Sequence, residues 1–416
     1  MRRITVFCLF ALVAATLSPA TKAVAAHGGG LTVQVGSQLA VGDNCDPDTG
    51  KRCRSGESMR FLAPALSVHK GDTVNFDFAS FHTATLLPVG QDALVFRGSQ
   101  TGGVGKPYSL LIQDPDDTAE EGAPAEKPAV KANPATANRT IGGAPADCGT
   151  PDNPCDYDGT QVVNSGLPLG PGQDTFAATV TANAGQGFWV ICLVHTHMFL
   201  RVNVVADSAT TTTQELINTT KASMIASDLE WAQETDAKLL RARSSHVTSS
   251  GQRVYDVKAG VDNHWAALLE FYPKKVSVPK GATVRYHFGN LVYEDHTVTL
   301  PAPSAFDLFP EFFAFGCDPD ADAGPGPDTP PGEGPPCGGN FSQIEIDISS
   351  RAMWGMGDGI FTGSTDLEHS GVRGAQFSNS FYDVKFRARS AKKGWKAFCL
   401  IHGPGMANRV VVKPTI

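Results

Sequence analysis

Hydrophobic and polar residues alternate along much of the chain, which is the pattern of β-strands, and several alternating segments occur twice. Residues 65–74 (ALSVHKGDTV) resemble residues 275–284 (KVSVPKGATV). In each segment a Lys-Gly turn separates two strand-like runs, and glycine supplies the backbone freedom that the turn needs. Each segment leads into a histidine within another alternating run, His82 in FHTATL and His296 in DHTVTL, and these histidines are 214 residues apart.

A second motif repeats at nearly the same spacing. Apolar, strand-like runs at 187–192 and 394–399 end in Cys192 and Cys399, and each cysteine is followed three residues later by a histidine, His195 or His402. The two cysteines are 207 residues apart. Two features that recur in the same order at nearly one offset predict a duplicated β-rich domain.

The segment between the two copies has a helical pattern instead. From Thr211 to His246 the chain has no Gly or Pro and scatters apolar residues among polar ones, which predicts an amphipathic connecting helix. The expected apolar positions are Leu216, Ile217, Met224, Ile225, Leu229, Trp231, Leu239 and Leu240. Residues 113–143 and 317–337 are rich in Pro, Gly, Ala and acidic residues, and we expect them to be exposed inserted loops.

Composition and the N-terminal residues indicate the compartment. The 42 acidic residues exceed the 34 basic ones, which disfavours a nucleic-acid partner, and 43 Gly and 28 Pro are typical of a loop-rich β protein. Arg2 and Arg3 precede an apolar run from Ile4 to Leu17, and an Ala-Val-Ala sequence ends at residue 25, which predicts a signal peptide over residues 1–25. No later stretch is apolar enough for a membrane span, so we expect a secreted or periplasmic protein.

The remaining cysteines fall into two classes. Six lie as close neighbours in polar segments, and in an oxidising compartment they predict three local disulfides: Cys45 with Cys53, Cys148 with Cys155, and Cys317 with Cys337. Cys192 and Cys399 have no close cysteine neighbour. They could pair with each other, but a disulfide would not require the histidine that follows each of them.

Each copy offers a set of donors that suits copper. The runs after the cysteines also contain Met198 and Met406, so each copy holds two imidazoles, one thiolate and one thioether. Soft sulfur with imidazole suits copper in both oxidation states, and a His₂Cys plane with a weak axial Met is a blue-copper electron-transfer site. Zinc is less suitable because Met is a poor zinc ligand, and no Cys-x-x-Cys-His haem attachment motif is present.

These motifs resemble those of the cupredoxins, the plastocyanin- and azurin-like blue copper proteins, in two tandem copies. The Cys-x2-His-x2-Met spacing of the first copy is similar to that of amicyanin, whereas the second copy departs from it with three residues between His402 and Met406. The resemblance implies an all-β protein with two Greek-key β-sandwich domains, at 26–207 and 249–416, joined by a helical linker at 208–248. Asn164-Ser-Gly also resembles a cupredoxin segment.

The same resemblance implies a role for each ligand. His82 and His296 would be buried anchoring ligands, and the cysteines would be the thiolate ligands of two type-1 copper sites. His195 and His402 would lie nearer the surface as electron ports, and the methionines would be axial. The complete ligand set is His82, Cys192, His195 and Met198 in the first copy and His296, Cys399, His402 and Met406 in the second.

Several alternatives remain open at this point. The sites could have lost copper and be ordinary core residues, or the protein could store copper. A copper redox enzyme of the nitrite-reductase or oxidase kind would need a further copper at an interface, for which the candidate histidines are His69, His264, His287 and His369. The paired His-x-His motifs of a trinuclear centre are absent, since His195-Thr-His197 is the only such sequence, and His197 and His27 have no assigned role. We therefore expect an electron carrier with redox protein partners.

Overall fold

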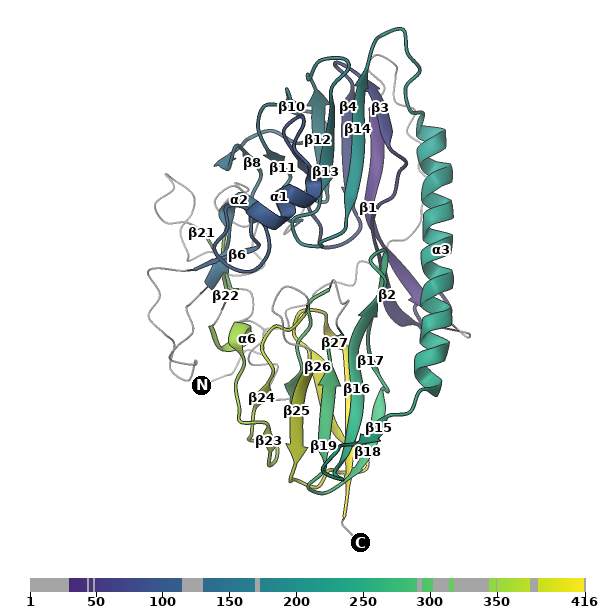
Figure 1. Ribbon diagram of the computed structural model, residues 1–416, viewed down its shortest axis with the longest axis vertical. Coiled ribbons are helices and arrows are strands. Elements are labelled where there is room, and N and C mark those ends of the chain that lie inside the picture. Colours follow the sequence, from purple (N-terminus) through teal and green to yellow (C-terminus); the bar gives the residue numbers. More distant parts are fainter. Residues whose placement is uncertain are drawn as a thin grey trace, which may run out of the picture.

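The computed structural model describes residues 30–42, 45–47, 49–113, 130–168, 173–289, 294–301, 314–317, 344–348, 350–374 and 381–414, and the signal peptide expected at 1–25 lies outside them. The described chain is predominantly β-structure, as predicted, in two halves with a long helix beside both (Figure 1). None of the described helices combines the length and the apolar character that crossing a membrane requires.

One sheet runs through both halves. Its strands, in spatial order, are β10 (Cys155–Tyr157), β12 (Thr175–Val180), β4 (Thr73–Phe78), β1 (Leu31–Val41), β2 (Arg54–Phe61), β17 (Ala266–Tyr272), β16 (Arg253–Asp262), β19 (Thr283–His287), β25 (Phe381–Phe386) and β23 (Ile360–Phe361), with β15 (Ser245–Val247) paired to β16. The halves meet where β2 pairs antiparallel with β17. Outward from this junction both halves repeat the same pairing, including a parallel pair, β1 with β4 and β16 with β19.

Each half has a second sheet of its own. In the first half it contains β3 (Leu66–His69), β14 (Phe199–Val205), β13 (Gly187–Ile191), β5 (Thr85–Leu86), β11 (Val163–Asn164), β8 (Thr140–Ile141) and β9 (Ala144–Pro145). In the second half it contains β18 (Lys275–Pro279), β27 (Gly403–Lys413), β26 (Trp395–Cys399), β20 (Thr299–Leu300) and β24 (Glu368–His369). In each half, apolar side chains of this second sheet and of the shared sheet belong to one hydrophobic core, so the prediction of two β-sandwiches is confirmed.

The inserted segments join the halves a second time. β6 (Leu111–Gln113) and β7 (Val130–Ala132) belong to the first half, and β21 (Ala314–Cys317) and β22 (Ile344–Ile348) to the second, yet all four form one sheet in which β7 pairs with β22. Short helices flank them: α1 (Ala93–Gln100), α2 (Pro134–Ala137) and α6 (Ser350–Trp354). The prediction of an exposed loop was therefore wrong for residues 130–143, because strand pairing buries Val130 and Thr140; residues 114–129 and 318–343 lie outside the described residues.

The predicted linker helix is α3 (Gln214–Arg241), which begins at the N-cap Thr213 and lies against β1, β2 and β17 (Figure 1). The sequence pattern wrongly predicted Leu216 and Leu240 on the buried face of the helix, since both are about half exposed. Ile225, Leu229 and Trp231 do pack against the sheet, and two buried carboxylates add polar contacts. Asp228 accepts hydrogen bonds from Arg60 at 2.7 Å and from Ser58 at 2.6 Å, and Asp236 accepts one from Tyr272 at 2.8 Å.

Two of the three predicted disulfides are present. Cys45 bonds to Cys53 and Cys148 to Cys155, each closing a short surface segment. The third expected pair includes Cys337, which lies outside the described residues. Cys192 and Cys399 are buried free thiols, so they are not bonded to each other.

Candidate metal centres

The first centre consists of His82, Cys192 and His195, which the fold brings together from distant parts of the chain. Cys192 follows β13 directly, His195 lies in the turn toward β14, and His82 precedes β5, which pairs with β13. The Nδ1 atoms of the two imidazoles are 2.7 Å apart, and they lie 4.0 and 3.8 Å from the sulfur of Cys192. One ligand atom from each of the three buried residues lies within 4.8 Å of the other two.

The second centre repeats this geometry with His296, Cys399 and His402. The two Nδ1 atoms are 3.1 Å apart, and Cys399 Sγ lies 3.4 Å from His402 Nδ1. His296 precedes β20, and β20 pairs with β26, the strand that ends at Cys399. The structure thus brings together both of the histidine–cysteine–histidine sets that were read from the sequence.

Backbone donors prepare each thiol to be a thiolate. Thr83 N–H donates to Cys192 Sγ at 3.4 Å, and Thr297 N–H donates to Cys399 Sγ at 3.3 Å. Burial alone would raise the pKa of these thiols, but the hydrogen bonds and charges of the neighbouring histidines outweigh burial and hold the pKa of both well below the usual value. A buried thiolate between two imidazoles is a ready metal ligand.

A serine braces the strand beside each centre. Ser165 accepts a hydrogen bond from Ala84 N–H at 2.9 Å, and Ser370 accepts one from Val298 N–H at 2.8 Å. The residue before each serine bonds to the next threonine on that strand, Asn164 in the first half and His369 in the second. The sequence contains this signal, since Asn-Ser-Gly at 164–166 corresponds to His-Ser-Gly at 369–371.

A glycine lies against each anchoring imidazole. Gly36 on β1 and Gly260 on β16 both occupy irregular register positions with φ of +73° and +72°. A Cβ on Gly36 would lie 2.3 Å from His82 Nε2, and a Cβ on Gly260 would lie 1.9 Å from His296 Nε2. No larger residue fits there without displacing the ring, so these two positions require glycine.

The two candidate axial methionines lie in the same apolar core as the cysteines. Met198 and Met406 are each 1% exposed, and Met198 C=O accepts a hydrogen bond from Cys192 N–H at 3.1 Å. Both methionine side chains are therefore buried within the core that contains the two thiols.

Carboxylates that sequence reasoning missed hold the far nitrogens of three imidazoles. Glu57 Oε1 lies 2.7 Å from His82 Nε2. Glu294 lies between the halves: its Oε2 is 2.7 Å from His195 Nε2 and its Oε1 is 3.1 Å from His402 Nε2. Burial alone would raise the pKa of Glu294, but the charges and hydrogen bonds of both imidazoles outweigh burial and lower it well below the usual value.

His195 and His402 are more exposed than the anchoring histidines His82 (0%) and His296 (1%), as expected, but only slightly. His195 is only 5% exposed, and the side chain of His402 is 13% exposed. Their rings point toward one another across the junction, with Glu294 between them. The position of Glu294, two residues before His296, was the only sequence signal for its role. Nothing in the sequence around Glu57 marked that residue.

Solved structures similar to this chain include several copper proteins. Auracyanin B is 18% identical with a TM-score of 0.20, and the match covers 39% of this chain and 88% of that one. The blue copper oxidase from Nitrosomonas europaea is 12% identical (TM-score 0.17, 92% and 85% covered), and the copper nitrite reductase from Nitrosomonas europaea is 10% identical (TM-score 0.16, 92% and 94% covered). No family model and no curated protein matches the chain.

The donor atoms at both centres fit copper. Each centre presents two imidazole nitrogens and one thiol sulfur in a largely buried cluster, and the second nitrogen of three of the four rings lies within 3.1 Å of a carboxylate oxygen. Such carboxylate–histidine pairs fix the ring orientation and the tautomer that leaves the other nitrogen free for a metal. Nitrogen with soft sulfur is the set that copper prefers.

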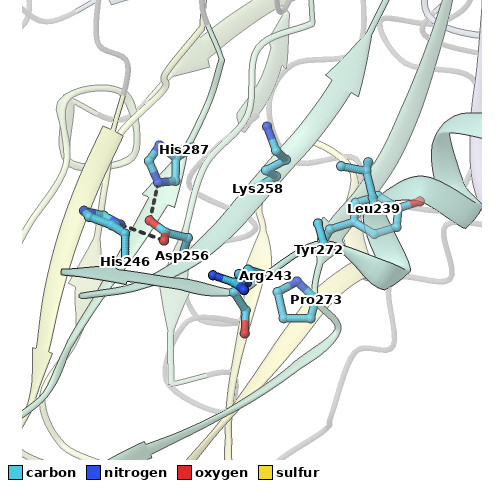
Figure 2. Close-up of a pocket in the computed structure, with 10 residues that line it drawn as sticks. Leu239, Arg243, His246, Asp256, Lys258, Tyr272, Pro273 and His287 are labelled. Atoms are coloured by element: carbon cyan, nitrogen blue, oxygen red, sulfur yellow. Dashed lines mark hydrogen bonds and ion pairs between the residues drawn. The ribbon is translucent and has the colours of Figure 1, made fainter. Parts of the chain in front are cut away.

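Other histidines have different neighbours. Figure 2 shows His246 and His287 on either side of Asp256 in a surface pocket, where the two ring nitrogens lie 2.8 and 2.7 Å from its two carboxylate oxygens. His69 lies 3.0 Å from Ala209 C=O, and His264 packs edge-on against His197. His369 braces the second centre. Among the described residues, only the two centres already named gather three ligand atoms within 4.8 Å.

One buried cation lies beside the first centre. Arg97, on α1, donates a hydrogen bond to Cys192 C=O at 2.6 Å, and burial lowers the pKa of its guanidinium to about 10. α1 has no described counterpart in the second half, so this contact distinguishes the two centres. Sequence pattern gave no signal for it.

Proposed function

We propose that this chain is an exported copper protein built from two tandem cupredoxin-like domains, at 26–207 and 249–416, and that it carries electrons. Each domain holds one type-1 copper. The ligands are His82, Cys192, His195 and Met198 in the first domain and His296, Cys399, His402 and Met406 in the second. Residues 1–25 direct export, and the partners are redox proteins outside the cytoplasm.

The observation that carries this proposal is the convergence of two Nδ1 atoms and one sulfur in each half. His82 Nδ1 and His195 Nδ1 face the same thiol, while their Nε2 atoms face carboxylates. A core cysteine or histidine without a metal role would not need this division between the two ring nitrogens.

The chain's own residues supply a rigid frame for a metal. Paired strands fix His82 and Cys192, the N–H groups of Thr83 and His195 donate to the sulfur, and the apolar core keeps water away. Copper bound in such a frame supplies one-electron redox chemistry. Because the ligand positions are set by strand pairing, little atomic movement accompanies a change in charge, which is what electron transfer requires.

A copper redox enzyme is the alternative, and it would need a further metal beyond the two centres. Within the described residues the four candidate histidines have other neighbours, and no third group of ligands gathers. This favours the electron carrier. Metal content separates the two functions, because a third copper without blue absorption would indicate an enzyme.

The test uses the two cysteines. Copper-loaded wild type should show the intense visible absorption of a copper–thiolate bond and contain two coppers per chain. Cys192→Ser and Cys399→Ser should each remove one blue copper, and the double variant should be colourless while remaining folded by circular dichroism. Wild type that binds no blue copper would refute the proposal.

A further inference from the structure

The two centres share a single side chain. Glu294 places one carboxylate oxygen 2.7 Å from His195 Nε2 and the other 3.1 Å from His402 Nε2, so one residue contacts an imidazole of each half. Glu294 itself is two residues from His296 in the sequence. It therefore belongs to the second half by connectivity and to both halves by contact.

Burial makes these contacts strong. The side chains of Glu294 and His195 are 11% and 6% exposed, so solvent screens their interaction weakly. A carboxylate on one ring nitrogen holds the proton there and leaves the other nitrogen free to bind a metal. In both rings the nitrogen that faces the thiol is Nδ1, the one that Glu294 does not contact.

The junction of the halves keeps the bridge in place. β2 pairs with β17, α3 lies against both strands, and the inserts pair through β7 and β22. These three connections fix the halves relative to each other. His195 and His402 consequently lie close enough for one glutamate side chain to contact both.

We propose that Glu294 is a shared positioning residue that makes the two centres a coupled pair. Both imidazoles contact the same carboxylate, so a change of metal or charge at one centre alters the interaction of Glu294 with the imidazole of the other centre. The Cu(II) affinity and reduction potential of each centre then depend on one carboxylate. This inference rests on the proposed copper function.

Glu57 provides the matched control. It contacts His82, at 2.7 Å, and hydrogen-bonds Ser80, both in the first half, so it serves the first centre alone. Glu368 is a second control, because it is buried in the second half but bonds Tyr382 and Gly359 N–H instead of a ligand. Loss of a buried carboxylate as such is thereby separated from loss of the bridge.

The experiment measures each centre separately in the full-length chain. Cys399→Ser leaves only the first blue centre and Cys192→Ser only the second, and Cu(II) affinity is measured by chelator competition with blue absorption as the signal. Glu294→Gln should lower the affinity by about 10- to 100-fold at both centres, the usual effect of removing such a partner. Glu57→Gln should do so at the first centre only, and Glu368→Gln at neither.

Reduction potentials distinguish positioning and charge from simple structural damage. Glu294→Gln removes a negative charge that favours the more positive Cu(II) state, so the potential of both centres should rise. Glu294→Asp keeps the charge, so it should lower affinity while the potentials stay closer to wild type. The proposal is overturned if Glu294→Gln changes one centre or neither, or if Gln and Asp move the potentials equally. Wild type without two blue coppers would instead refute the proposed function.

Discussion

Replacing Gly260 by alanine should remove the second centre and spare the first. An ideal Cβ at this position lies 1.9 Å from His296 Nε2, 2.5 Å from Cδ2 and 2.8 Å from Cε1, so the ring must move by more than an ordinary rotamer adjustment. The backbone φ of +72° adds a further cost. Gly281 is the control, since it has φ of +88° and nothing within 4 Å of its Cβ position.

The two costs can be separated. Left-handed backbone strain is roughly 1–2 kcal/mol for alanine, and both variants pay it. Overpacking a filled site destabilises by roughly a further 1–3 kcal/mol, and this applies only to Gly260→Ala. Apo Gly260→Ala should therefore unfold at lower urea concentration than Gly281→Ala. Metal sites tolerate ligand displacements of only about 0.5 Å, so the second centre should also lose its copper.

The assay is copper content with visible absorption after loading. Gly260→Ala should bind one blue copper and Gly281→Ala two, while Gly36→Ala, with its Cβ 2.3 Å from His82 Nε2, should lose the first centre instead. If Gly260→Ala retained both blue coppers, the tight contact with His296 would not be what fixes that ligand. Equal copper loss in Gly281→Ala would assign the effect to backbone strain.

Two further predictions concern stability. Burial lowers the pKa of His369 from 6.5 to about 4, so between these pH values the folded protein binds fewer protons than the unfolded chain. The free energy of unfolding should therefore fall by about 3 kcal/mol as the pH drops from 6.5 to 4. His369→Asn, which places the residue of the first half (Asn164) at this position, should flatten the pH dependence of urea unfolding. Asp228→Asn should cost up to about 3 kcal/mol in urea unfolding because it leaves Arg60, only partly exposed, without its carboxylate, whereas Glu234→Gln on the exposed face of α3 should be neutral.

The centres could be predicted from sequence because their ligands recur in a local pattern. Cys192 and His195 are three residues apart at the end of an apolar run, and the second half repeats them, so spacing alone pointed to the sites. The upstream histidines followed from the matched turns before them. The pairing of β5 with β13 places His82 next to Cys192, as the pattern predicted.

The connection between the halves could not be predicted in this way. β2 and β17 pair through backbone groups, which every strand edge offers, so no side-chain pattern marks the junction. The acids that hold α3, Asp228 and Asp236, look like ordinary solvent-facing residues in the sequence, yet both are buried. Glu294 acquires its role only because the junction brings the other half's His195 within reach.

Titrating the full-length, metal-free protein with Cu(II), followed by visible absorption and electron paramagnetic resonance, tests the central claim most directly. Blue absorption should rise linearly and stop at two coppers per chain, and every bound copper should give the narrow hyperfine pattern of a thiolate-ligated site. Saturation at one copper, or bound copper with the spectrum of an ordinary nitrogen and oxygen site, would contradict two histidine–cysteine–histidine copper centres.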